Sequence, residues 1–180
     1  NTLTGITSGL EYIFGLAGAD TITGGSGTDD LTGGADGDTF IYSPGHASII
    51  GFAVASGLLG AGTLLAPIEG NTFTGTEVIR DLVTGDTLST GNSLLTADTG
   101  VVGTLGTLEE NEYILVAGSY SGTVFTVAAT GADTLLIYDA DSATNGVQQA
   151  AIVLVGVSNT EAALVFNANG VLRAFSLTVS

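Results

Sequence analysis

The apolar positions near the start of the chain recur at a fixed spacing of nine residues. Three consecutive units cover Gly15 to Ile41, with glycines concentrated in the first half of each. Every unit has an aspartate at its sixth position and a large apolar residue at its eighth: Asp20 and Ile22, Asp29 and Leu31, Asp38 and Phe40. A flexible glycine-rich linker would need neither the apolar position nor the constant phase. The period therefore indicates a solenoid of stacked units.

Each unit is expected to be a tight turn followed by a very short strand. Glycine accepts the positive φ angles of such turns, and the alternation after each aspartate is that of a half-buried strand. Stacking would bury the apolar positions together and leave carboxylates and glycine carbonyls along the turns. Carboxylates in rows repel one another. Calcium, which takes roughly six to eight oxygen ligands in irregular geometry, would remove that repulsion.

The units resemble the glycine- and aspartate-rich nonapeptide repeats of RTX proteins. These are the calcium-binding parallel β-rolls of Gram-negative secreted toxins, proteases, epimerases and S-layer proteins. A fourth, degenerate unit precedes the three at Ile6 to Phe14, with Gly9, Glu11 and Ile13 at the corresponding positions. The resemblance implies a right-handed roll of about four units.

The resemblance also implies that ions lie between turns two units apart. Asp20 would then share an ion with Asp38, and Glu11 with Asp29. Asp36 stands where the family usually has glycine, so it could supply an extra ligand or cap the roll. The metal-site residues expected in these turns are Asp20, Asp29, Asp38, Asp36, Glu11, Gly18, Gly25, Gly27 and Gly34.

The charge balance indicates that metal binding is required for folding. Among 180 residues, 18 are acidic and only Arg80 and Arg173 are basic, which gives a formal net charge of −16. Such a chain disfavours nucleic acid and anionic membranes as partners. It also repels itself, so we expect folding to depend on metal, with a loose metal-free form. Cysteine is absent, which excludes disulfides and thiolate metal sites.

The middle of the chain offers two segments with open interpretations. Ala47 to Ile68 is uncharged and largely apolar, about as long as a membrane span. Its glycines and the lack of flanking Lys or Arg favour a buried loop, a short helix or an association surface. Glu77 to Leu88 resembles the segment that follows the roll in RTX proteins. There, Asp81 and Asp86 either bind an ion or simply form a turn with Gly85.

From Glu112 onward, runs of Val, Ile, Leu, Phe and Tyr predict strands separated by Gly, Asn, Asp and Ser turns. The expected strands are 113–117, 123–128, 134–138, 151–157, 163–166 and 171–177, with a hairpin at Asn167 to Gly170 between the last two. We expect them to form an antiparallel sandwich that continues the roll and protects its open edge.

One turn in this region is a second candidate calcium site. The segment from Asp133 to Gly146 resembles the Tyr-Asp-Ala-Asp segment of C-terminal RTX modules, and Asp139, Asp141 and Asn145 place three oxygen donors on one turn. Calcium could use these donors. Asx residues also form turns by bonding their own backbone, which explains the segment without an ion.

We expect no catalytic site in this chain. His46 has no second histidine or cysteine with which to bind zinc, so we interpret it as a turn residue. Glu109, Glu110 and Glu112 are too close in sequence to hold two carboxylates at a defined separation. The glycine runs lack the Lys-Ser/Thr of a phosphate loop.

The two ends of the sequence suggest a piece of a longer exported protein. No Met and no signal peptide open the chain, so we expect an excised C-terminal region. Ala174 to Ser180 resembles the uncleaved signal that sends RTX proteins through a type I ABC transporter, and the same residues also fit a last strand.

The patterns and the resemblance to RTX proteins together imply an all-β protein in which a short right-handed, calcium-binding parallel β-roll (residues 1–45) continues into an antiparallel β-sandwich cap with an export signal (residues 46–180). The predicted function is a non-enzymatic module that folds on calcium outside a Gram-negative bacterium and supports type I export and calcium-dependent assembly of an S-layer-like surface protein. The alternative is the secretion and stability module of an RTX protease, lipase or epimerase whose catalytic domain lies upstream.

Overall fold

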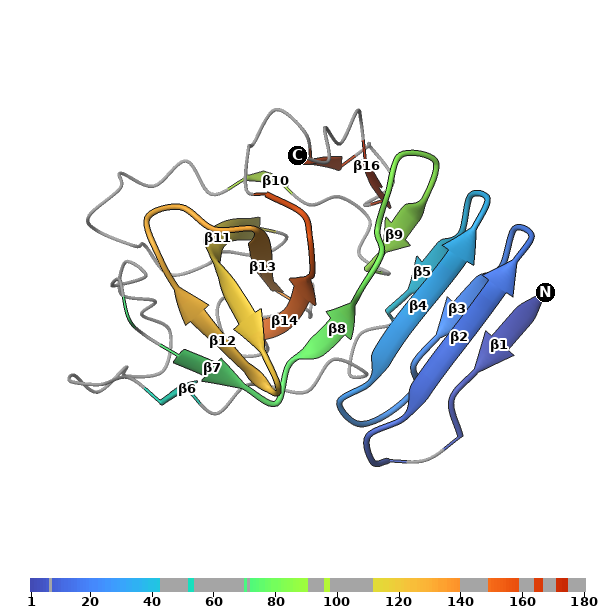
Figure 1. Ribbon diagram of the computed structural model, residues 1–180, viewed down its shortest axis with the longest axis horizontal. Helices are drawn as coiled ribbons and strands as arrows, with labels where there is room; N and C mark the ends of the chain where they lie inside the picture. Colours follow the sequence, from blue (N-terminus) through green and yellow to red (C-terminus); the bar gives the residue numbers. More distant parts are fainter. Residues whose placement is uncertain are drawn as a thin grey trace.

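The computed structural model describes residues 1–6, 8–42, 52–53, 70, 72–90, 96–97, 112–139, 149–158, 164–166 and 171–174. This part of the chain is all-β and forms two sheets, as the sequence predicts (Figure 1). Among these residues, no helix is long and apolar enough to cross a membrane.

The smaller sheet has six strands. Their order is β1 (Thr2–Thr4), β3 (Thr21–Thr23), β5 (Thr39–Ile41), β9 (Thr87–Ser89), β16 (Val171–Ala174) and β15 (Leu164–Phe166). The pairs from β1 to β9 are parallel, whereas β9, β16 and β15 pair antiparallel. One sheet therefore contains both the roll geometry and the sandwich geometry.

The larger sheet has ten strands and the same division. Its order is β2 (Tyr12–Ala17), β4 (Asp30–Ala35), β8 (Glu77–Ile79), β14 (Gln149–Leu154), β13 (Asp133–Asp139), β11 (Glu112–Ser121), β12 (Val124–Val127), β7 (Thr72–Thr74) and β6 (Phe52–Ala53), with β10 (Thr96–Ala97) beside β11. The pairs from β2 to β14 are parallel. Those from β14 to β6 are antiparallel.

The parallel strands form the predicted roll, because successive strands alternate between the two sheets. Ile13 pairs in register with Leu31, and Ile22 with Phe40, a step of two nine-residue units in each sheet. The apolar residue of every unit thus points into the space between the sheets.

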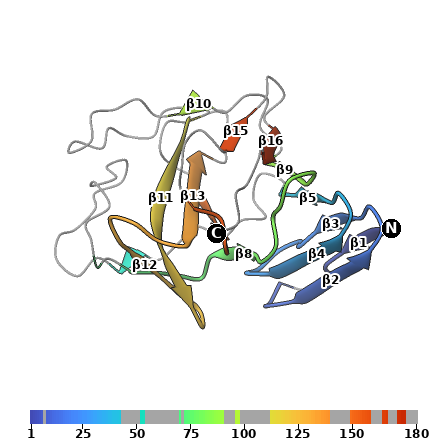
Figure 2. The same ribbon diagram turned by 45° about the horizontal axis from the view of Figure 1, so that its top comes forward.

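The roll does not end where the nine-residue pattern is interrupted. After residue 42 the chain leaves the roll, and it returns at β8 and β9, which pair parallel with β4 and β5 (Figures 1 and 2). Ile79 lies beside Leu31, and Leu88 beside Phe40. The residues that fill the roll interior are completely buried: Ile22, Leu31, Phe40, Ile79 and Leu88.

The antiparallel strands lie close to where the sequence predicts them, including the hairpin of β15 and β16. In β13, Leu136 and Tyr138 face the roll-side core, while Leu135 and Ile137 join a second apolar cluster with Phe125. The central strands of the larger sheet are therefore buried on both faces. This explains why their sequences are continuously apolar instead of alternating.

Several predictions fall outside the described residues: those for His46, Asn145, Glu109 and Glu110, the turn at Asn167 to Gly170, the chain end after Ala174, and the apolar stretch Ala47 to Ile68 except for the strand β6. The domain division at residue 45 stays a prediction. The pairing of β8 and β9 with roll strands lies beyond it.

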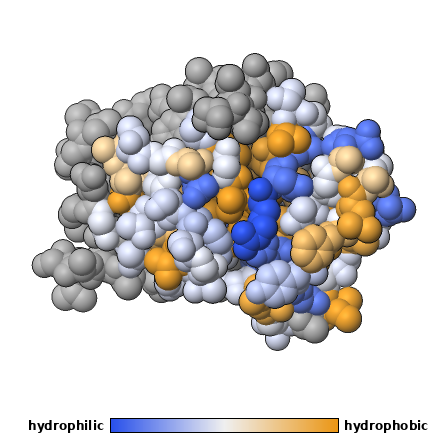
Figure 3. All heavy atoms as spheres, in the orientation of Figure 1, coloured by the Kyte–Doolittle hydropathy of each residue, from blue (hydrophilic) through white to orange (hydrophobic). Residues whose placement is uncertain are grey.

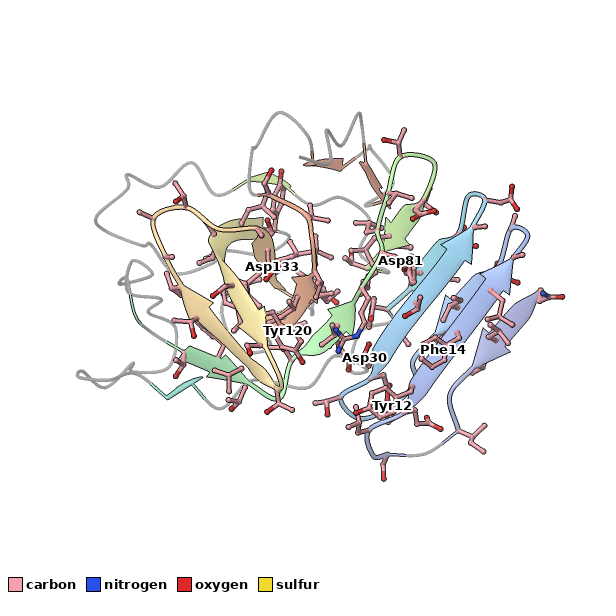
Figure 4. All side chains as sticks on the ribbon, in the orientation of Figure 1. Tyr12, Phe14, Asp30, Asp81, Tyr120 and Asp133 are labelled. Atoms are coloured by element: carbon pink, nitrogen blue, oxygen red, sulfur yellow. The ribbon has the colours of Figure 1, made fainter. Side chains whose placement is uncertain are left out.

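Arg80 connects the roll to the antiparallel strands. The Nε atom of Arg80 donates to both carboxylate oxygens of Asp30, at 2.7 and 2.9 Å. The guanidinium carbon of Arg80 lies 5.9 Å from the ring centre of Tyr120, on β11. Figure 4 shows Asp30 and Tyr120 facing each other across this contact. The Asp30 side chain is only 7% exposed, so Arg80 compensates a charge that is mostly buried.

We expect Arg80→Gln to lower the free energy of unfolding in saturating calcium by about 1–3 kcal/mol, because it leaves the Asp30 carboxylate buried without its charged partner. Urea unfolding would measure the change. Arg80→Lys is the matched control. It keeps the charge but not the bidentate contact with both carboxylate oxygens, so it should lower the free energy of unfolding by less than Arg80→Gln does. A change below about 0.5 kcal/mol for Arg80→Gln, the usual size for a surface substitution, would contradict this role.

Candidate metal centre

Acidic side chains form two rows along the turns of the roll. The first, which we call the Glu11 row, precedes or begins the strands β2, β4 and β8 of the larger sheet. The second, the Asp20 row, precedes β3, β5 and β9 of the smaller sheet. The members are Glu11, Asp29 and Glu77 in the first row, and Asp20, Asp38 and Asp86 in the second. Each stands two residues before an apolar residue of the interior.

Within each row, the backbone N–H of one acidic residue donates to the carboxylate of the next. The four bonds are Glu11 N to Asp29 Oδ1 at 3.0 Å, Asp29 N to Glu77 Oε2 at 2.7 Å, Asp20 N to Asp38 Oδ1 at 2.9 Å and Asp38 N to Asp86 Oδ1 at 2.9 Å. One oxygen of Asp29, Glu77, Asp38 and Asp86 thus fixes the register of neighbouring turns. The pairs that the sequence predicts, Asp20 with Asp38 and Glu11 with Asp29, lie side by side.

The second oxygen of most of these carboxylates is buried without a hydrogen-bond partner. The atoms are Asp20 Oδ2, Asp29 Oδ2, Asp38 Oδ2 and Glu77 Oε1. The four residues are at most 2% exposed. A buried carboxylate oxygen without a donor or cation is unfavourable by several kcal/mol, roughly, when the group is ionised. The arrangement therefore favours a bound cation over an empty interior.

Glycines leave room for such a cation beside the carboxylates. A Cβ atom at Gly24 would lie 2.7 Å from Asp29 Oδ2. One at Gly15 would lie 2.8 Å from Asp20 Oδ2 and still closer to the carbonyl oxygen of Gly33. Carboxylate and carbonyl oxygens therefore face the same small space, which any larger residue would fill. Oxygen-only donor sets of this kind suit calcium.

No three acidic or histidine side chains converge on one point in the part of the chain that the structure describes. An ion in either row would therefore draw its ligands from two carboxylates and from backbone carbonyls. That combination needs consecutive turns in register, so a site of this kind exists only when the roll is folded.

Burial acts on the titration of these groups. It raises the pKa of Asp29 and Asp86, and it raises that of Glu77 to about 8. Asp20 differs, because the ammonium group of Asn1 lies 2.7 Å from its Oδ1 and lowers its pKa. The first three environments disfavour negative charge until a positive partner is present.

Comparison with known families agrees with this geometry. Residues 6–40 match the RTX calcium-binding nonapeptide repeat in four copies. Residues 6–40 are RTX repeats. The match includes the degenerate first unit that the sequence predicts at Ile6 to Phe14. RTX repeats bind calcium, are structural and not catalytic, and are typical of proteins that type I systems secrete to the extracellular space. No curated protein matches the chain.

The glycines predicted for the RTX turns have the left-handed backbone that these turns require. The φ angles of Gly18, Gly25, Gly27 and Gly34 lie between 93° and 129°. Asp36 also has a positive φ, 78°, and its Oδ2 accepts a hydrogen bond from Gly18 N at 3.1 Å. Asp36 thus repeats, in an exposed turn, the carboxylate-to-backbone bond of the two rows. Its role as ligand or cap stays a prediction.

The second predicted calcium site is only partly covered by the described residues. Asp139 ends strand β13, and Asp141 lies outside the described residues. Among the candidates after the roll, Asp81 accepts hydrogen bonds from the N–H groups of Gly33 and Gly34, each at 2.8 Å. Both oxygens of Asp86 likewise accept backbone N–H groups, from Asp38 and Val83. These bonds fit the turn interpretation of Asp81 and Asp86.

Glu77 is the row member that the sequence prediction did not select. The signal was present, because Glu77 and Asp86 are nine residues apart and each precedes an apolar residue by two positions. That is the spacing of the RTX units, displaced by the residues between Tyr42 and Glu77. Two isolated units are too few to reveal a period without knowledge of the strand pairing.

We expect Asp29→Asn to reduce the number of calcium ions taken up on folding by at least one. Asp29 lies in the middle of its row, and asparagine keeps the acceptor for Glu11 N but not the charge. The slope of the logarithm of the folding constant against the logarithm of free calcium gives the ion number. Circular dichroism during a calcium titration would measure it.

Asp133→Asn is the matched control for this experiment. Asp133 is also a buried aspartate with two backbone donors, Tyr120 N at 2.6 Å and Gly156 N at 2.8 Å, but it belongs to neither row. Its replacement should raise the calcium midpoint by weakening the fold, and leave the slope unchanged. An unchanged slope for Asp29→Asn would count against its role as a ligand.

Proposed function

We propose that this chain is a calcium-responsive folding module from the C-terminal part of a larger exported bacterial protein. The observation that supports it most strongly is the pair of carboxylate rows, whose second oxygens are buried without partners. In the low calcium of the cytoplasm, repulsion within the rows and a net charge of −16 would keep the chain loose. Such a chain is suited to export through a type I ABC transporter.

Outside the cell, calcium would fill the turns and stack the repeats. Extracellular modules bind calcium with dissociation constants of roughly 0.1–1 mM, close to the concentration around the cell. Because each sheet runs from the roll into the antiparallel strands, ordering the roll would also order the rest of the described fold. Binding and folding would then be one event, and the module itself would carry out no catalysis.

We expect the purified chain to lose most of its strand signal by circular dichroism in EDTA at pH 7.5, and to regain it on calcium addition with a midpoint of about 0.1–1 mM. Magnesium should replace calcium poorly, because it demands near-ideal octahedral geometry and keeps its water. A fully folded spectrum in EDTA would contradict the proposed function.

A second function, calcium-dependent self-association into a surface layer, is favoured by one observation. Five of the six exposed large apolar residues in the described chain lie between positions 6 and 16: Ile6, Leu10, Tyr12, Phe14 and Leu16. We call them the edge patch. The last three alternate along β2, which is the edge strand of its sheet. Figure 4 shows Tyr12 and Phe14 projecting from this strand, and Figure 3 shows apolar surface over the roll.

We propose that the occupant of the edge patch is a second copy of the chain. Among the described residues, β2 has a neighbouring strand on one side only, so unpaired backbone groups lie beside the edge patch. An open strand edge beside apolar side chains is a template for pairing between chains. The alternative, a secretion and stability module of an extracellular RTX enzyme, needs no such contact and predicts a monomer.

We expect sedimentation velocity to show calcium-dependent association of the chain, and Phe14→Ser to weaken it about tenfold or more while folding is retained. Val83→Ser is the matched control, since Val83 is the one exposed large apolar residue of the described chain outside the edge patch. Calcium-bound wild type that stays monomeric at high concentration would favour the enzyme-module alternative.

A further inference from the structure

Glu77 occupies the position in its row that Glu11 and Asp29 occupy in the matched repeats. Its Oε2 accepts the N–H of Asp29 at 2.7 Å, just as Asp29 Oδ1 accepts the N–H of Glu11 at 3.0 Å. The register agrees, because Val78 pairs with Asp30 as Asp30 pairs with Tyr12. Glu77 nevertheless lies well beyond residues 6–40, which match the RTX repeat.

The free oxygen of Glu77 has no protein partner. Glu77 is 1% exposed, and neither its Oε1 nor the neighbouring Asp29 Oδ2 has a hydrogen-bond partner. Two carboxylates therefore share a buried environment, each with one oxygen unsatisfied. Asp86, at the same point of the other row, differs: Val83 N lies 2.8 Å from its Oδ2 and Asp38 N 2.9 Å from its Oδ1. The last carboxylate of the Asp20 row thus has both oxygens bonded to backbone donors, whereas the last carboxylate of the Glu11 row has one oxygen without a partner.

Glu77 also lies where the two halves of the fold meet. It begins β8, which pairs with the roll strand β4 on one side and with β14 on the other. Its neighbour in β14 is Ile152, so no further carboxylate continues the row. A cation between Asp29 and Glu77 would therefore be held by residues 48 positions apart, at the end of the roll.

We propose that Glu77 is a calcium ligand, which completes with Asp29 a metal site at the point where the roll passes into the antiparallel sheet. This inference rests on the proposed calcium-dependent folding. It adds that the matched repeats alone do not form the full set of sites, because one ligand, Glu77, comes from β8, outside these repeats. Calcium at this site would couple the roll to the antiparallel strands.

The test is a calcium titration of the full chain followed by circular dichroism, for wild type, Glu77→Gln, Glu77→Asp and Asp133→Asn. Glutamine keeps an acceptor for Asp29 N but removes the charge. We expect the slope of the logarithm of the folding constant against that of free calcium to fall by one ion, with a midpoint about tenfold higher. Glu77→Asp should restore the wild-type slope, because it keeps the charge and Asp29 already fills the equivalent position of the row with an aspartate.

Asp133→Asn is the control for a purely structural carboxylate, because Asp133 accepts two backbone N–H groups and belongs to neither row. Its midpoint should rise while its slope stays that of wild type. A wild-type slope for Glu77→Gln would overturn the inference and leave the proposed function standing. A wild type without any calcium dependence would instead overturn the proposed function.

If Glu77→Gln does not fold at any calcium concentration, anomalous diffraction from wild-type crystals grown with terbium tests whether an ion binds at Glu77. A peak within about 2.3–2.6 Å of a Glu77 carboxylate oxygen supports the site. Peaks elsewhere in the roll with none at Glu77 would overturn it.

Discussion

The structure depends on the hydrogen bonds that backbone N–H groups of one turn donate to the row carboxylates Asp29, Asp38, Glu77 and Asp86 of the next. These bonds set the register of the roll and align the apolar residues of its interior. They also place the second carboxylate oxygens in rows that water does not reach. The geometry that specifies the fold therefore creates an electrostatic cost that a divalent cation removes. Calcium binding and folding are therefore coupled in one equilibrium.

This dependence extends beyond the RTX repeats, because neither sheet stops at the end of the roll. Completely buried residues of the roll and of the antiparallel strands, among them Ile79 and Ile152, belong to one apolar cluster. Arg80 adds a charged contact from Asp30 of the roll to Tyr120 of β11. The antiparallel part of the larger sheet starts at β14, which pairs with β8 of the roll. We therefore do not expect these strands to fold independently of the roll. We therefore regard the described fold as one cooperative unit.

The sequence predicted the features that repeat or are local. A period of nine with an aspartate and an apolar residue in each unit was enough for the roll, and apolar runs between turn residues were enough for strands such as β11 and β13. The return of the chain at Glu77 was not predictable, because pairing across 48 residues leaves no local pattern. The contact of Arg80 with Asp30 depends on that same register. The part of the edge patch on β2 could not be predicted for another reason. Phe14 and Leu16 look like core residues in the sequence until β2 is known to be an edge strand.

Hydrogen exchange of individual backbone amides, compared in calcium and in chelator, tests the central claim most directly. The account predicts strong protection in calcium for the row amides of Asp29 and Asp38 and for core strands such as β13 and β14. It predicts that all of this protection is lost together when calcium is removed, because one equilibrium controls both regions. Protection that persists in chelator, in the roll or in the antiparallel strands, would contradict it.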